Sequence, residues 1–197
     1  KALFPKMRIS RSKNTETETV TSTGGGRFSV SLEGSITGRG ADLIIIDDPN
    51  KPDEQSSASV YASINEIFDN TIASRLDDPK KGQIIVVMQR LHQNDLSGYL
   101  LAKGGYRHLS IPIRAEEQLR FKLATGRTKV MKRGEPMHPE RMDTKAIDQK
   151  MSEVGARIFS AQYMQQPVPA SGNIFKTDWV KYAPIPERRH CEAVYLS

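Results

Sequence analysis

The chain has 197 residues and a net charge of +6, with a pI near 9.4. That length is enough for one domain with a hydrophobic core and part of a second domain. No apolar run approaches the roughly 20 residues that cross a bilayer, and no signal-like segment stands at the start, so we expect a protein that is soluble, not secreted and not in a membrane. The single cysteine, Cys191, excludes an internal disulfide and fits a reducing compartment.

The first predicted elements are strands. Residues 17–31 alternate polar and β-prone residues around a run of three glycines, which predicts a hairpin with a glycine turn. Residues 35–40 predict a glycine-flanked loop that brings Arg39 towards the next strand. That strand is 43–46, Leu-Ile-Ile-Ile, and its unbroken apolar composition predicts burial on both faces, as in a parallel sheet covered by helices.

Two carboxylates, Asp47 and Asp48, follow this strand directly, and Pro49 then ends it. Ligands of parallel sheets gather at the carboxyl edge of the strands. Carboxylates at that edge can hold Mg²⁺ and orient a water molecule, which is the Walker B arrangement of nucleotide-hydrolysing P-loop folds. An Asp-Asp-Pro turn without any such role explains the pattern equally well.

A helix and a second strand continue this pattern. Apolar residues recur at helical spacing over 57–76, which predicts a core-facing helix. The run 84–88, Ile-Ile-Val-Val-Met, predicts another buried strand. A strand, helix, strand crossover places the carboxyl ends of both strands at one edge of the sheet. The polar residues expected together at this edge are Asp47, Asp48, Gln89 and Arg90.

Further helices are expected towards the C-terminus. Asn94 or Asp95 is expected to cap a short helix, and 106–113 predicts one more strand. A longer helix is expected over 143–166, because Pro167 cannot continue it. The residues expected on its core-facing side are Ile147, Met151, Val154 and Ile158.

An acid-free basic run covers residues 118–134, and another covers 1–13. Such runs can follow a phosphate backbone without recognising a sequence. A solvated basic loop explains 118–134 almost as well, because Phe121 is its only aromatic residue that could stack on a base. The candidate DNA-binding residues are Arg120, Lys122, Arg127, Lys129, Lys132 and Arg133.

Three domain-level segments are predicted. Residues 1–166 form the main domain, and 167–192, rich in proline and poor in periodicity, predict a linker. Residues 193–197 open a new strand. Because both ends of the sequence cut through apparently structured segments, we expect a fragment of a larger polypeptide.

Several strings carry a resemblance to one family. They are Thr-Gly-Arg-Gly-Ala-Asp-Leu-Ile-Ile-Ile-Asp-Asp-Pro at 37–49, Val-Met-Gln-Arg-Leu-His-Gln-Asn-Asp-Leu-Ser-Gly at 87–98, Ala-Gln-Tyr-Met-Gln-Gln-Pro at 161–167 and Phe-Lys-Thr-Asp-Trp at 175–179. On these strings the chain resembles the large terminase subunit of tailed bacteriophages and prophages. The matches are collinear over roughly residues 5–197.

The resemblance implies an α/β fold: part of a P-loop (ASCE-type) ATPase domain with a mostly parallel sheet, then a linker and the first strand of an RNase H-like nuclease domain. The parent protein would translocate double-stranded DNA into procapsids by ATP hydrolysis and cleave concatemeric DNA. The cofactors implied are ATP and Mg²⁺. The partners implied are double-stranded DNA, the small terminase subunit and the portal protein, on which the parent would form a ring in the cytoplasm of the bacterial host.

Four residues receive roles from the resemblance. Asp47 would be the Mg²⁺-associated carboxylate, and Asp48 would orient the attacking water, although the family often has Glu there and Asp is one methylene shorter. Gln89 and Arg90 resemble the coupling motif that senses the γ-phosphate. The family often has Thr in place of Gln89 and Trp in place of Leu91.

Two other residues have competing interpretations. Arg39 could act as an arginine finger, because a planar cation stabilises a charge-delocalised phosphoryl transition state. A simple ion pair with an acid such as Asp42 or Asp48 is the favoured interpretation. For His92 a structural hydrogen bond is favoured over metal binding, because the four histidines have no ligand spacing.

The sequence contains no Gly-x-x-x-x-Gly-Lys-[Ser/Thr] loop to bind the triphosphate. In the family this loop lies upstream, so the status of this chain as an enzyme is uncertain and we expect background ATP hydrolysis at most. Without that part of the sheet, we expect an exposed apolar face and self-association or marginal stability. The alternative function is a non-enzymatic, degenerate prophage remnant that binds DNA or protein, and another P-loop enzyme such as a helicase is less favoured.

Overall fold

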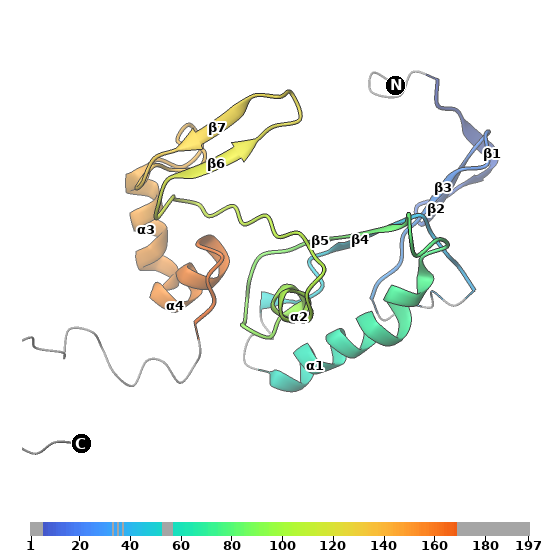
Figure 1. Ribbon diagram of the computed structural model, residues 1–197, viewed down its shortest axis with the longest axis horizontal. Helices are drawn as coiled ribbons and strands as arrows, with labels where there is room; N and C mark the ends of the chain where they lie inside the picture. The colour runs from blue at the N-terminus through green and yellow to red at the C-terminus, as the bar shows by residue number, and fades with distance from the viewer. Residues whose placement is uncertain (1–5, 33, 35, 37, 53–56, 169–197) are drawn as a thin grey trace, which may run out of the picture.

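The computed structural model describes residues 6–32, 34, 36, 38–52 and 57–168. These residues form a mixed α/β structure with three small sheets, whose strand orders are β1-β2-β3, β4-β5 and β6-β7. Figure 1 shows the parallel pair β4-β5 in the middle, with the other two sheets towards opposite ends of the molecule. None of the described helices is long and apolar enough to cross a membrane.

The central unit is a strand, helix, strand crossover, as predicted. β4 (Leu43–Asp47) and β5 (Gln83–Val87) pair in parallel, with Asp47 opposite Val87. The crossover contains α1 (Ala58–Ile67), which continues through a π-helical turn and a 3₁₀ turn. These turns are η2 (Phe68–Ile72) and η3 (Ala73–Arg75), so the predicted helix over 57–76 is confirmed in extent.

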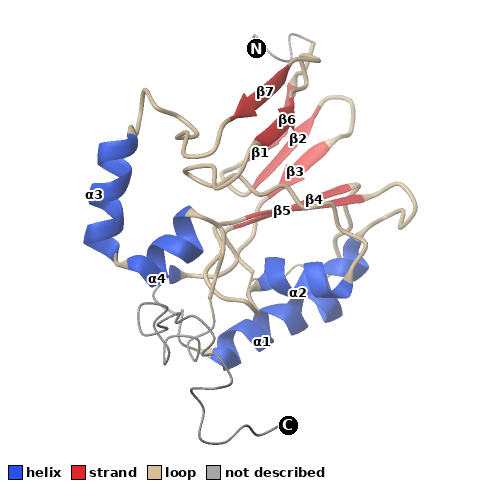
Figure 2. Ribbon diagram, turned by 60° about the vertical axis from the view of Figure 1, so that its left-hand side comes forward, coloured by secondary structure: helices blue, strands red, loops and turns tan. Residues whose placement is uncertain are grey.

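One face of the parallel pair carries the main core. Ile46 and the other strand residues on its face pack on α1, η2 and α2 (Leu96–Lys103). These helical elements lie on the same side of the pair in Figures 1 and 2. Alternate residues of a strand face opposite sides. The buried members of this core are Ile46, Ile64, Phe68, Ile72, Leu96 and Leu100.

The other face of the parallel pair is bare. Leu43 is 48% exposed, Ile45 61%, Ile85 43% and Val87 53%. The prediction of a strand buried on both faces is therefore wrong, because the described helices cover only one side of the pair. The expected exposed apolar face is present.

The two remaining sheets are antiparallel, so the expectation of a mostly parallel sheet holds only for β4-β5. β2 (Glu18–Thr21) and β3 (Gly26–Phe28) form the predicted hairpin with its glycine turn, and β1 (Ile9–Asn14) extends it. The run 106–113, predicted as a strand, forms none. Instead, the basic run pairs as β6 (Leu119–Lys122) with β7 (Thr128–Met131).

The predicted helix over 143–166 is interrupted. α3 (Thr144–Val154) ends at Gly155, whose φ of 81° no helix can accommodate, before α4 (Ala156–Ile158) and the π-helical turn η4 (Phe159–Tyr163). This break changes the buried face: Met151 and Ile158 are exposed, and Phe159 and Met164 pack with Ile147 instead. The linker and strand predicted beyond residue 168 lie outside the described residues.

Substitutions on the two faces of β4 are expected to change the free energy of unfolding by different amounts. We expect Ile46→Ala to lower the free energy of unfolding by about 2–4 kcal/mol, because it removes buried methyl groups from the core. Ile45→Ala is the matched control and should change it by less than about 0.5 kcal/mol, because Ile45 is on the bare face. Urea unfolding measures both. Equal losses for the two variants would contradict the described register.

Candidate functional site

The carboxyl edge of β4-β5 brings the two predicted polar segments together. Asp47 ends β4 opposite Val87, and the Asp48 amide donates a hydrogen bond to the Val87 carbonyl at 2.9 Å. Gln89 follows two residues later and is half-buried, whereas both aspartates are exposed. The predicted placement of both strand ends at one edge is confirmed. Because Asp47 shares its register row with Val87, it lies on the bare face of the pair.

The acidic doublet stands on an unusual turn. Asp48 has a φ of 43°, a left-handed conformation that costs a non-glycine residue about 1–3 kcal/mol. Beyond the turn, Asn50 is buried, and its Oδ1 accepts a hydrogen bond from the Leu96 amide at 3.2 Å. The turn that carries the carboxylates is therefore fixed to the first residue of α2.

The loop after β5 is closed by a buried carboxylate, Asp95. The Nε atom of Arg90 donates to both Asp95 oxygens at 3.0 Å, and Asp95 is 0% exposed. Asp95 also accepts hydrogen bonds from the amides of Leu91, His92 and Gly98. The Arg90 side chain, 12% exposed, is therefore held against the start of α2 by its ion pair with Asp95.

Gly98 allows this close arrangement. A Cβ atom at that position would lie 1.8 Å from the Gln93 carbonyl oxygen and 2.9 Å from the Arg90 Nη2 atom. The expected cap is confirmed as Asp95, whose Oδ1 accepts from the Gly98 amide at 2.8 Å. Sequence reasoning left the cap open between Asn94 and Asp95, and it missed that the Asp95 carboxylate also binds Arg90.

His92 has a structural role, as favoured from the sequence. Its ring stacks on Tyr61 with centroids 4.8 Å apart, and its Nδ1 atom accepts a hydrogen bond from the Asn94 amide at 3.1 Å. In the described ranges, no group of three or more His, Cys, Asp or Glu side chains is arranged to hold a metal ion.

A residue that sequence reasoning missed links this loop to the C-terminal helices. Gln165 accepts a hydrogen bond from the Arg90 amide at 3.1 Å through its Oε1 atom. Its backbone is left-handed, with a φ of 61°, and its side-chain amide donates to the Gln162 carbonyl. No local signal marks such a contact, because the two residues are separated by 75 positions.

Arg39 lies on the N-terminal sheet. Its Nη1 and Nη2 atoms donate to the two carboxylate oxygens of Glu18 at 2.9 and 3.3 Å, and its guanidinium lies 4.2 Å from the Phe28 ring centroid. The expected ion pair with an acid is therefore present, but its partner is Glu18 and not Asp42 or Asp48. The partner comes from a strand 21 residues earlier, which local sequence could not indicate.

The six candidate DNA-binding residues belong to the β6-β7 hairpin and its flanks, away from the carboxyl edge of β4-β5 in Figure 1. They do not share one surface. Lys129 is half-buried, and its Nζ atom donates to the Met137 carbonyl at 2.8 Å. The exposed members are Arg120, Lys122, Arg127, Lys132 and Arg133.

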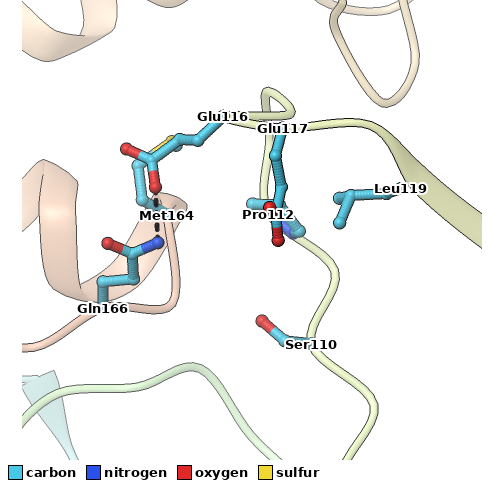
Figure 3. Close-up of a pocket in the computed structure, with 7 residues that line it drawn as sticks. All are labelled: Ser110, Pro112, Glu116, Glu117, Leu119, Met164 and Gln166. Atoms are coloured by element: carbon cyan, nitrogen blue, oxygen red, sulfur yellow. Dashed lines mark hydrogen bonds between the residues drawn. The ribbon is translucent and has the colours of Figure 1, made fainter. Parts of the chain in front are cut away.

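A hollow beside the start of β6 is a separate feature, shown in Figure 3. Gln166 donates a hydrogen bond to Glu116 across it at 2.6 Å. Its two carboxylates make it unsuited to a phosphate group, so we assign it no nucleotide. The lining residues are Ser110, Pro112, Glu116, Glu117, Leu119, Met164 and Gln166.

Comparison with known proteins does not extend this description. No protein-family model matches the chain, and the search of curated proteins gives no significant match.

The Asp95 carboxylate should be essential to the loop. We expect Asp95→Ala to cost about 3–5 kcal/mol of unfolding free energy, because it leaves the Arg90 charge buried without its partner. Asn94→Ala, at the exposed neighbouring position, is the control and should change it by less than about 0.5 kcal/mol. Urea unfolding followed by circular dichroism measures both. A loss of unfolding free energy below about 1 kcal/mol for Asp95→Ala would show that the loop does not depend on this carboxylate.

The Arg39 contact predicts a pKa change. Arg39 first, and Lys13 second, hold the pKa of the Glu18 carboxyl below its ordinary value of 4.5. Arg39→Gln should raise this pKa towards 4.5, and Lys13→Gln should raise it less. Carboxyl ¹³C NMR titration measures both. Because the folded-state pKa is the lower one, the ion pair stabilises the fold above the unfolded pKa, and this stabilisation is lost as the pH falls through the folded pKa.

An unchanged Glu18 pKa in the Arg39→Gln variant would show that Arg39 is engaged elsewhere. That result would reopen the arginine-finger interpretation.

Proposed function

We propose that this chain is the Walker B and coupling segment of a terminase-type ATPase that packages double-stranded DNA. The observation that carries the proposal is the parallel pairing of β4 with β5, which places Asp47 and Asp48 beside the segment that begins at Gln89. Ligand chemistry in parallel sheets is concentrated at this edge. The sequence strings that resemble terminases surround the same two strands.

The acidic doublet suits a cation that is shared with a nucleotide. Mg²⁺ is usually held by one or two carboxylates together with substrate phosphates and waters, so it does not need a cage made of protein ligands alone. Asp47 is exposed at the strand end and can supply such a ligand. Bound there, Mg²⁺ would neutralise charge on the phosphate oxygens.

Asp48 is proposed to orient the attacking water. Its left-handed turn, anchored to Val87 and followed by the buried Asn50, holds its position relative to Asp47. A fixed carboxylate next to the metal ligand matches the role of a water-positioning residue in phosphoryl transfer.

Coupling is proposed to run through the loop after β5. Gln89 stands at the edge, and the Arg90 amide binds Gln165, which leads into the segment before the predicted linker. A shift of this loop would therefore move the C-terminal helices through this hydrogen bond. Arg90 is proposed to act through its backbone and its Asp95 ion pair, because its side chain is committed to that contact.

The phosphate-binding loop is proposed to come from a part of the parent polypeptide outside this sequence, as are the nuclease carboxylates. Double-stranded DNA, the small terminase subunit and a portal ring remain partners proposed from the resemblance. The 197-residue chain itself is expected to hydrolyse ATP only at background rate.

One observation favours the alternative, a non-enzymatic remnant that binds DNA or protein. Arg90, which the resemblance relates to γ-phosphate sensing, and Arg39, the candidate arginine finger, both form ion pairs, with Asp95 and Glu18 respectively. The surrounding coding sequence separates the two proposals. An intact phosphate-binding loop upstream and acidic nuclease motifs downstream support the motor, whereas stop codons favour the remnant.

The decisive test uses the polypeptide encoded by the complete reading frame. We expect Asp47→Ala and Asp48→Ala each to lower the kcat of ATP hydrolysis by about 100-fold or more, because one removes the Mg²⁺ ligand and the other the group that orients water. Asp42→Ala is the matched control, since this exposed aspartate precedes the opposite end of β4. An unchanged kcat in the Asp47 and Asp48 variants would overturn the assignment.

A further inference from the structure

The β6-β7 hairpin has one anchored face and one free face. In its antiparallel register, Leu119 lies opposite Met131 and Phe121 opposite Lys129, so these four residues share a face. Met131 on this inner face is fully buried. The alternate residues Arg120, Lys122, Thr128 and Val130 form the outer face, and all four are exposed.

The two flanks of the hairpin are bonded to each other, and the Ile113 amide links them to the C-terminal helices by donating to the Tyr163 carbonyl at 2.8 Å. The Gly134 amide donates to the Ala115 carbonyl at 2.7 Å, and the Ala115 amide donates to the Glu135 carbonyl at 3.0 Å. The Met137 carbonyl accepts a hydrogen bond from the Lys129 Nζ atom, and the Met137 amide donates one to the Ile113 carbonyl. The outer face is therefore presented on a fixed support, and a ligand would not have to pay the entropy of ordering a loop.

The outer face and its flanks carry uncompensated positive charge. Within the described part of the chain, none of the five exposed basic side chains of the hairpin forms an ion pair, although other described lysines and arginines do. The nearest acids in sequence are Glu116, Glu117 and Glu135. Of these, Glu116 accepts a hydrogen bond from the Gln166 side chain, and Glu135 accepts one from the Lys132 amide. We call these five the basic ribbon: Arg120, Lys122, Arg127, Lys132 and Arg133.

We propose that the basic ribbon binds the phosphate backbone of double-stranded DNA. Clustered lysines and arginines without acidic partners bind phosphates independently of sequence. Phe121, the only aromatic residue of the hairpin, lies on the inner face, so the outer face lacks the stacking platform that single-strand binding uses. A two-stranded ribbon also fits the major groove of a DNA duplex.

The two parts of this inference have different bases. The phosphate contact follows from the charge and exposure of the hairpin alone. The choice of DNA over double-stranded RNA rests on the proposed packaging function.

The test measures binding of this chain to a short fluorescein-labelled DNA duplex by anisotropy over a range of salt concentrations. The triple variant Arg120→Gln, Lys122→Gln, Arg127→Gln should weaken binding at least tenfold at low salt. It should also reduce the slope of log Kd against log salt by about 2.7, because each lost phosphate contact contributes about 0.9. Circular dichroism of the variant checks that the fold is retained.

A matched triple variant removes the same charge from exposed positions off the hairpin: Lys80→Gln, Arg107→Gln, Arg157→Gln. It should keep the wild-type slope. Equal losses in the two triple variants would overturn the proposal, because net charge alone would then explain binding. Wild-type binding by the hairpin variant would overturn it as well.

Other nucleic acids test the choice of ligand. A single strand of the same length that binds as tightly as the duplex would overturn the duplex assignment, and tighter binding of an RNA duplex would overturn the choice of DNA. Because this assay contains no ATP, its outcome is independent of ATP hydrolysis. Loss of DNA binding in the hairpin variant, with no effect of Asp47→Ala on hydrolysis, would retain the ribbon and reject the motor.

Discussion

The buried carboxylate of Asp95 is the contact on which the central unit depends. It neutralises Arg90, accepts three backbone amides and begins α2, which supplies Leu96 and Leu100 to the core under β4. A buried charge is tolerated only when it is paired and fully hydrogen-bonded, and Asp95 meets both conditions. The path of the chain after β5 therefore follows from the need to satisfy one carboxylate.

This constraint shapes what the site can do. The same loop that Asp95 closes is bonded to Gln165, and α2 holds Asn50 behind the acidic doublet. The strand ends, the doublet and the C-terminal helices are thus mechanically connected through a few hydrogen bonds. Under the proposed function, this connection would be the route by which a shift at the sheet edge reaches the C-terminal helices.

The bare face of β4-β5 and the basic ribbon are two exposed surfaces that suit different partners. Parallel strands are normally covered on both sides, and the exposed Ile45 and Val87 leave a continuous apolar surface beside Asp47. The ribbon leaves unpaired cations in a different part of the molecule. The first surface calls for apolar cover and the second for a polyanion, so the two surfaces do not compete for one partner.

Local patterns in the sequence determined the elements of the central unit: the apolar runs of β4 and β5, the stripe of α1, the glycine turn before β3 and the Asp95 cap all depend on residues close in the chain. Tertiary structure alone decided the partners. Arg39 binds Glu18, the Arg90 amide binds Gln165, and Asn50 binds the Leu96 amide. The physical reason is that secondary structure follows neighbouring residues, whereas burial and ion pairing depend on which distant segments supply the covering surface and the opposite charge.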